Sequence, residues 1–177
     1  MSELELRLNN VNIGKVREVV EKAKSDPSVV KRRMVIKGSW NLGEGPQFKT
    51  RVKFEEGEAD IVVDLPKFMG GSGSAPSPLH ICLAGLTSCF AGTIASIASE
   101  KGVKLKVLEV TVEASYDFSK TFGLADKPIL EGIEFKVNID TEDAGREEVE
   151  EIIRQAEERC PAMYCLTRPI PVKVSIG

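Results

Sequence analysis

The feature that most constrains the fold is the stretch from Pro78 to Lys101, which carries no charged side chain before Glu100. Proline at its start and Gly102 just after its end are the residues that helix termini favour, so we predict one long helix over 78–101. Because charge is nearly absent all round, we expect this helix to be buried on most sides. The rest of the domain must then be built around it.

Shorter segments on either side alternate apolar and polar residues, or repeat apolar residues at helical spacing. The alternating segments predict strands, and the short links between them favour antiparallel pairing. The expected order is helix 15–24, strands 29–40, 47–54 and 58–64, loop 66–77, helix 78–101, strands 106–116 and 133–139, helix 145–159 and strand 170–176. This order predicts an α+β domain with antiparallel sheet.

Composition narrows the class of protein. The chain has 177 residues, 42% of them hydrophobic and 29% charged, which is typical of one globular domain. A net charge of −3 gives no basic face for nucleic acid, so we expect no nucleic-acid partner. We find no signal-peptide layout at the N-terminus and no apolar run that we judge long enough to cross a membrane, and we therefore expect a cytoplasmic protein.

Four cysteines, Cys82, Cys89, Cys160 and Cys165, are too few for a disulfide scaffold. In a reducing compartment such residues are metal ligands, catalytic thiols or simply small buried side chains. A four-thiolate zinc site is disfavoured, because Cys82 and Cys89 are separated by seven residues on a rigid helix whereas zinc sites use closely spaced cysteines in turns. We expect neither a metal nor a cofactor.

Cys89 and Cys160 stand in distinctive contexts. Small residues crowd around Cys89 in GLTSCFAGTIAS, which would let another helix approach closely. Cys160 precedes Pro161, so the helix should break there and a new turn could begin. A thiolate at the start of that turn would be stabilised by backbone N–H groups, although Cys160 could equally pack inward.

The long helix PLHICLAGLTSCFAGTIASIASEKG, a following strand, AEERCPAMYC and a last strand together resemble the OsmC/Ohr superfamily, the osmotically inducible protein C and organic hydroperoxide resistance proteins. The resemblance covers 35–176, so we divide the chain into an N-terminal helical extension, 1–28, and an OsmC-like domain, 29–177. It implies a curved antiparallel sheet wrapped around the long helix, and an intertwined homodimer whose sheets are completed by both chains.

The resemblance also implies a thiol-dependent peroxidase. Cys89 would be the peroxidatic cysteine and Cys160 the resolving cysteine, with a small hydroperoxide as substrate and an external dithiol as reductant. Cys82 and Cys165 would be structural, with Cys165 as an alternative resolving thiol.

One position departs from the pattern. Hydroperoxide-reducing members carry an acidic residue after the proline that opens the long helix, and it positions an arginine against the thiolate. Here Leu79 follows Pro78. Arg33 and Arg51, on expected strands, could supply a guanidinium. His80, nine residues before Cys89, should lie on the opposite side of the helix, which disfavours a role as base.

A different class of function stays open. The protein could bind a small molecule without turnover, using an apolar pocket at the dimer interface lined by the cysteines. The Gly71-x-Gly73 segment lacks the third glycine and the lysine of nucleotide-binding loops, so we expect a flap or a linker there.

Overall fold

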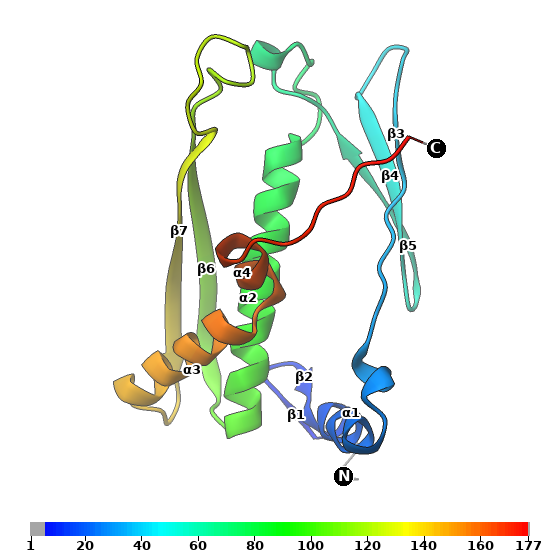
Figure 1. The fold of residues 1–177 in the computed structure, drawn as a ribbon. Coiled ribbons are helices and arrows are strands. Elements are labelled where there is room, and N and C mark those ends of the chain that lie inside the picture. The colour runs from blue at the N-terminus through cyan, green and yellow to red at the C-terminus, as the bar shows by residue number, and fades with distance from the viewer. Residues whose placement is uncertain (1–5, 177) are drawn as a thin grey trace. The chain divides into compact units, whose positions relative to one another are not determined.

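The computed structural model describes residues 6–176 (Figure 1). The chain divides into two compact units, which we describe separately. The first unit comprises the N-terminal residues up to Glu21 together with 85–177, and the second unit comprises 22–84. The long helix α2, Pro78–Lys101, begins in the second unit and continues into the first.

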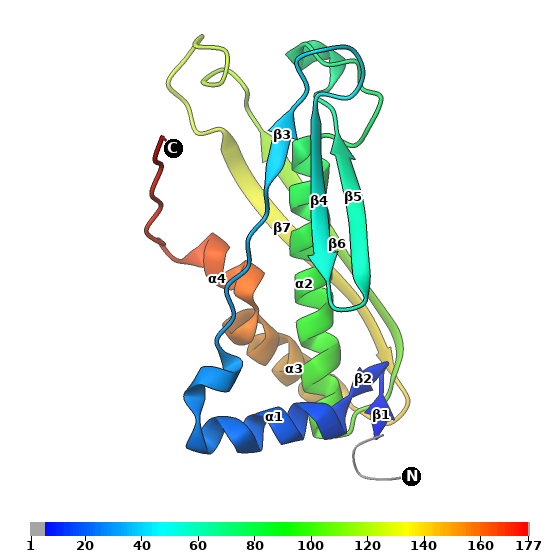
Figure 2. The ribbon, with the colours of Figure 1, turned by 90° about the vertical axis from the view of Figure 1, so that its right-hand side faces the viewer.

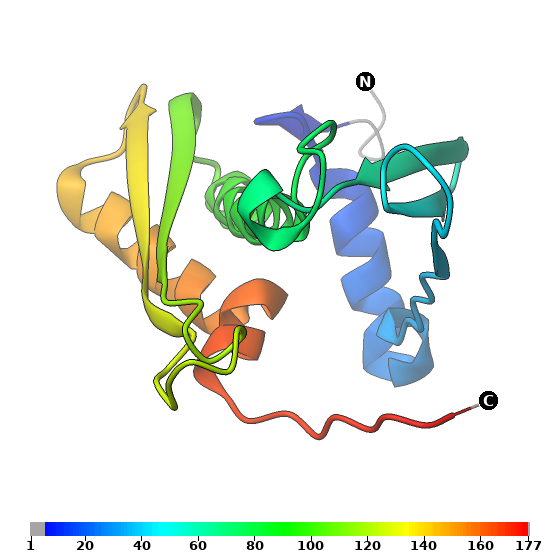
Figure 3. The same cartoon turned by 90° about the horizontal axis from the view of Figure 1, so that it is seen from above.

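The first unit packs the C-terminal part of α2 against a hairpin and two further helices (Figure 3). Its elements are β6, Leu105–Tyr116; β7, Leu130–Thr141; α3, Arg146–Arg159; and α4, Pro161–Thr167. The strands are antiparallel, with Val110 opposite Val137 and Val112 opposite Phe135. Phe90 of α2 meets the ring of Phe135 edge-on at 5.4 Å, which ties the helix to the hairpin. The buried core is completed by Ile94, Ile97, Ala98, Val103, Ile152, Ala156, Cys160 and Ala162.

A small N-terminal hairpin is anchored on the same unit (Figure 2). Its strands are β1, Arg7–Leu8, and β2, Val11–Asn12, followed by helix α1, Ile13–Ser25. Asn9 and Asn10 take left-handed backbone angles, φ 50° and 62°, as a two-residue hairpin turn requires. The Asn9 amide donates to the Val103 carbonyl at 2.8 Å and accepts from the Leu105 N–H at 2.8 Å. The turn is thereby held where α2 passes into β6.

The second unit is built on a three-stranded antiparallel sheet in the order β3-β4-β5. Its elements are the 3₁₀ turn η2, Pro27–Val30; β3, Gly38–Trp40; β4, Phe48–Phe54; β5, Gly57–Val63; and the 3₁₀ turn η3, Lys67–Met69. Trp40 pairs with Phe48, and Phe48 pairs in turn with Val63.

One carboxylate organises the glycine-rich loop after β5. Asp64 is 1% exposed, and its Oδ2 accepts from the N–H and hydroxyl of Ser72 at 3.2 and 2.5 Å. It also accepts from the N–H and hydroxyl of Ser74 at 3.0 and 2.9 Å. These hydrogen bonds, the Ser72 hydroxyl foremost, hold the pKa of Asp64 far below its usual range. The loop is therefore folded around a fixed negative charge.

The α+β class is confirmed, and the long helix has the predicted bounds. The strands predicted at 47–54, 58–64, 106–116 and 133–139 are present, and the observed ends differ from the predicted ends by at most a few residues. Instead of one sheet, the described residues form three separate antiparallel sheets. Completion of these sheets by a second chain stays a prediction.

Two predicted strands were wrong. The segment 29–40 is a 3₁₀ turn followed by irregular backbone and only the short β3, while 170–176 has no regular structure. In the latter, Val172, Val174 and Ile176 are 78%, 94% and 101% exposed. Alternation alone does not form a strand, because the backbone needs a neighbouring strand for its hydrogen bonds. The segment predicted as a pure loop, 66–77, contains η3.

The burial of α2 was also overestimated. Its buried residues are confined to the C-terminal half, at Phe90, Ile94, Ile97, Ala98 and Ser99. Its length and mean hydropathy of 1.8 would suffice to cross a membrane, which corrects our judgement that no run is long enough. A core helix in a soluble protein meets the same criterion, so the feature is weak evidence for a membrane. The boundary between an extension, 1–28, and a domain, 29–177, stays a prediction.

Candidate active site

Cys89 and Cys160 lie side by side in the first unit, although 71 residues separate them in sequence. Their Sγ atoms are 3.6 Å apart, and the Cys160 thiol is oriented to donate to the Cys89 sulfur. Both are free thiols, with Cys89 half-buried and Cys160 completely buried. The two sulfurs can thus be joined by a small local movement.

The local sequence explains why Cys160 lies at the junction of α3 and α4. Pro161 cannot continue the hydrogen bonding of α3, so the backbone turns to an extended conformation at Cys160. The Cys160 N–H still donates to the Ala156 carbonyl, and its own carbonyl accepts from the Tyr164 N–H, both at 2.9 Å. Cys160 is therefore the C-cap of α3 and the N-cap of α4. A new helix begins at Pro161 and the Cys160 side chain packs inward, while the stabilisation of a Cys160 thiolate stays a prediction.

The electrostatics at Cys89 favour the protonated thiol. Burial raises the pKa of Cys89, and the nearby sulfurs of Cys160 and Cys165 raise it further, while the backbone N–H of Ala162 acts in the opposite direction. None of these groups is a cation. Burial is the largest of these causes, and the pKa of Cys89 is raised rather than lowered.

A pocket of ≈ 510 Å³ opens beside Cys89 within the first unit. Its floor follows one stripe of α2, at spacings of three and four residues. Two of its lining residues, Arg159 and Glu100, form an ion pair in which Nη1 lies 3.5 Å from Oε2. The remaining lining residues are Ser88, Gly92, Thr93, Ser96, Ile97 and Pro161. Small side chains thus give a substrate room to approach the half-buried sulfur.

Both arginines considered from sequence lie in the second unit, whereas Cys89 belongs to the first, so their support of a thiolate stays a prediction. Arg51, on β4, pairs with Asp60 at 2.7 Å and Glu58 at 3.1 Å on the exposed face of its sheet. Arg33 lies in the irregular segment 31–37 and not on a strand, so its expected placement was wrong.

The remaining sequence candidates lie at helix surfaces. The His80 ring Nδ1 lies 2.9 Å from the Ser77 hydroxyl at the start of α2, where the two residues cap the helix. Cys82 is exposed on α2 and Cys165 is exposed on α4. Residues 6–176 contain no group of three or more His, Cys, Asp or Glu side chains arranged to hold a metal ion.

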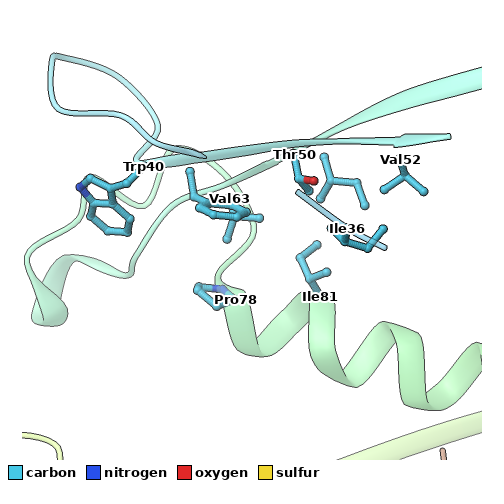
Figure 4. A pocket seen from close by; sticks show the side chains of 9 residues that line it. Ile36, Trp40, Thr50, Val52, Val63, Pro78 and Ile81 are labelled. Carbon is cyan, nitrogen blue, oxygen red and sulfur yellow. The ribbon is translucent and has the colours of Figure 1, made fainter. Parts of the chain in front are cut away.

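The second unit contains an apolar cavity of ≈ 490 Å³, between its sheet and the first turns of α2 (Figure 4). Pro78 and Ile81 face Val63 and Ile36 across it. The polar groups of its lining side chains are the Trp40 indole N–H and the Thr50 hydroxyl, which is already bonded to the Lys37 carbonyl at 2.9 Å. The cavity therefore suits hydrocarbon. Its other lining residues are Trp40, Phe48, Val52 and Ile61.

Sequence reasoning missed three features, the loop anchor Asp64 and two contributors to the surroundings of Cys89. Asp64 was predicted only as the end of a strand, because its partners Ser72 and Ser74 lie eight and ten residues further along the chain. The Arg159–Glu100 pair carries no local signal, because its partners are 59 residues apart. The effect of the Ala162 N–H on Cys89 depends on the helix that begins at Pro161, which the sequence indicated only as a possible new turn.

Known proteins with similar sequences and structures share this arrangement of elements. The chain is 28% identical to the organic hydroperoxide resistance protein OhrB of Bacillus subtilis over 117 residues. These residues make up 66% of this chain and 79% of OhrB. The crystal structure of an OsmC-like protein from Mycoplasma pneumoniae is 22% identical, with a TM-score of 0.59 over 77% of this chain and 89% of that one. An organic hydroperoxide resistance protein from Legionella pneumophila is 20% identical, with a TM-score of 0.56 over 77% and 92%.

At sequence identities of 20–22%, the two structural similarities establish the fold of this chain. The sequence family described as OsmC-like protein matches residues 71–175, which is more than half of the chain and includes both Cys89 and Cys160. The chain belongs to the OsmC-like protein family.

Proposed function

We propose that the protein reduces organic hydroperoxides through Cys89 and Cys160. The observation that carries the proposal is the 3.6 Å separation of the two sulfurs, one half-buried beside a pocket and the other fully buried behind it. The similarity to a hydroperoxide resistance protein supports the choice of substrate.

The chemistry follows from the two environments. The Cys89 thiolate attacks the distal oxygen of the hydroperoxide, the O–O bond breaks, and the alcohol leaves with a proton. Cys89 is then a sulfenic acid. The Cys160 sulfur attacks the Cys89 sulfur, a disulfide forms and water leaves. An external dithiol returns both thiols to the reduced state, so we place the cycle in a reducing compartment, the cytoplasm.

We further propose that the working form is a homodimer. The apolar side chains of 170–176 are exposed and alternate, which is what an unpaired strand of a shared sheet would present. The N-terminal half of α2 also leaves small and apolar side chains uncovered. A second chain could cover both, and it could bring to Cys89 a cation besides Arg159, which is paired with Glu100.

The deciding experiment is mass spectrometry of thiol state after one equivalent of cumene hydroperoxide. We expect a Cys89–Cys160 disulfide that is absent in Cys89→Ser, and a trapped sulfenic acid on Cys89 in Cys160→Ser. Cys82→Ser, on an exposed turn of the same helix, is the matched control and should behave as the wild type. Reduced Cys89 at excess peroxide in the folded dimer would contradict the proposal.

The apolar cavity favours a second candidate, the binding of an apolar molecule without turnover. Val63→Trp would fill the cavity from β5 while leaving the thiols untouched. Calorimetric titration with a medium-chain alcohol separates the functions: loss of binding with unchanged Cys89 oxidation assigns the cavity a role of its own. Absence of binding to the wild type removes this candidate.

A further inference from the structure

The pocket beside Cys89 holds two opposite charges, Glu100 from α2 and Arg159 from α3. Their side chains are 45% and 55% exposed, so both charges face the solvent-filled part of the pocket. The other titratable groups that act on Cys89 are the thiols of Cys160 and Cys165. Arg159 is therefore the cation that shares a pocket with the nucleophilic sulfur, and a nearby cation is what favours a thiolate.

The ion pair with Glu100 draws this cation away from Cys89. Glu100 follows Cys89 by eleven residues on α2. That spacing places the two on one stripe of the helix, about 20° apart around the axis and roughly 16 Å apart along it. A guanidinium that lies 3.5 Å from the Glu100 carboxylate is thus held along the pocket from the sulfur. The raised pKa of Cys89, to which no cation contributes, agrees with this arrangement.

The backbone of Arg159 nevertheless lies close to Cys89. Arg159 directly precedes Cys160, so their Cα atoms are about 3.8 Å apart. The Cys160 sulfur is in turn 3.6 Å from the Cys89 sulfur. Arginine has one of the most rotamer-rich side chains. Rotation about its side-chain bonds, within the pocket that both residues line, would carry the guanidinium from Glu100 toward Cys89 while α3 stays in place.

The pair with Glu100 is a weak restraint. It joins one nitrogen to one oxygen at 3.5 Å, whereas Arg154 on the same helix contacts Glu151 at 2.8 Å and Glu158 at 3.0 Å. Ion pairs this exposed contribute little, because water screens them. A thiolate at the half-buried Cys89 is screened less and attracts a cation more strongly. A negative charge that forms at Cys89 can therefore compete with Glu100 for the guanidinium.

We propose that Arg159 is the cation that supports the Cys89 thiolate, and that its ion pair with Glu100 restrains it in the resting site. When Cys89 loses its proton to solvent, Arg159 exchanges the carboxylate for the sulfur. Glu100 thus sets how readily the thiol is activated. The inference deepens the proposed function, and it rests on that function only for the identity of the oxidant.

The test measures the thiolate without peroxide. Cys89 of the reduced, full-length protein is alkylated with iodoacetamide at pH 7, and the labelled peptide is followed by mass spectrometry. Glu100→Gln releases the guanidinium, so alkylation should be about tenfold faster than in the wild type, the effect of a cation that lowers the thiol pKa by about one unit. Glu158→Gln is the matched control. It removes a partner of Arg154, which does not line the pocket, and should leave the rate unchanged.

A double variant separates the release of Arg159 from the loss of a negative charge near the sulfur. If Glu100 acts through Arg159, Glu100→Gln combined with Arg159→Gln should lose the tenfold gain. Glu100→Gln combined with Arg159→Lys should keep most of it, because the cation is retained. A gain that persists in the Arg159→Gln double variant, or no gain in Glu100→Gln, would overturn the inference.

Consumption of cumene hydroperoxide by the same variants tests the proposed function separately. Rates of Cys89 oxidation in the same order as the alkylation rates would support both proposals. Alkylation rates in the expected order, with Cys89 unoxidised by hydroperoxide in every variant, would support the role of Arg159 and contradict the proposed substrate.

Discussion

The pH dependence of Cys89 oxidation tests the electrostatic picture of the site directly. Burial raises the pKa of Cys89 above its ordinary value, and the shifting groups among the described residues include no cation. The thiolate is the reactive form. Below the pKa, the thiolate fraction rises tenfold for each unit of pH. From pH 6 to pH 8 we therefore expect the single-turnover rate to increase by about 100-fold.

Stopped-flow consumption of cumene hydroperoxide by the reduced protein gives this rate. Iodoacetamide labelling of Cys89, followed by mass spectrometry, should show the same slope, because alkylation also needs the thiolate. The reasoning is refuted if the rate reaches a plateau below about pH 7, since such a plateau requires a lowered pKa. If such a plateau were present in the dimer and absent in a monomeric variant, the cation that lowers the pKa of Cys89 would belong to the second chain.

Three further changes have defined outcomes. Ile152→Ala removes a fully buried side chain from the core of the first unit, so chemical denaturation should show a loss of about 2–5 kcal/mol, whereas Glu147→Ala on the exposed face of α3 should change little. Asp64→Asn should lower Tm at neutral pH. Because the folded pKa of Asp64 is lowered, its stabilisation is present above about pH 4 and lost below it, so the Tm difference should narrow on acidification; a constant difference contradicts the loop assignment. Val172→Asp with Val174→Asp should give a folded monomer by light scattering, and an unchanged dimer would exclude 170–176 from the interface.

Local signals in the sequence predicted local structure well. Pro78 and Gly102 gave the ends of α2 to the residue, because both act through backbone geometry within one turn. The alternation through Leu108, Val110 and Val112 predicted β6 for the same reason, since the faces of a strand depend only on residue parity.

Features that depend on distant contacts were not predictable in this way. The Asn9 turn is held by residues more than 90 positions away, and its hairpin was missed. The strand predicted at 170–176 needs a neighbouring strand, and no strand among residues 6–176 pairs with it. The nearness of Cys89 and Cys160 came from a family resemblance, because a separation of 71 residues carries no geometric information by itself.

The complete burial of Cys160 has a consequence for survival under oxidative stress. Excess peroxide can drive an exposed sulfenic acid onward to sulfinic and sulfonic acids, which ordinary thiols do not reverse. A sulfur that peroxide cannot reach escapes this damage. If the pair cycles as proposed, sulfinic and sulfonic acids should therefore accumulate at Cys89 within the pair, while Cys160 should not be overoxidised.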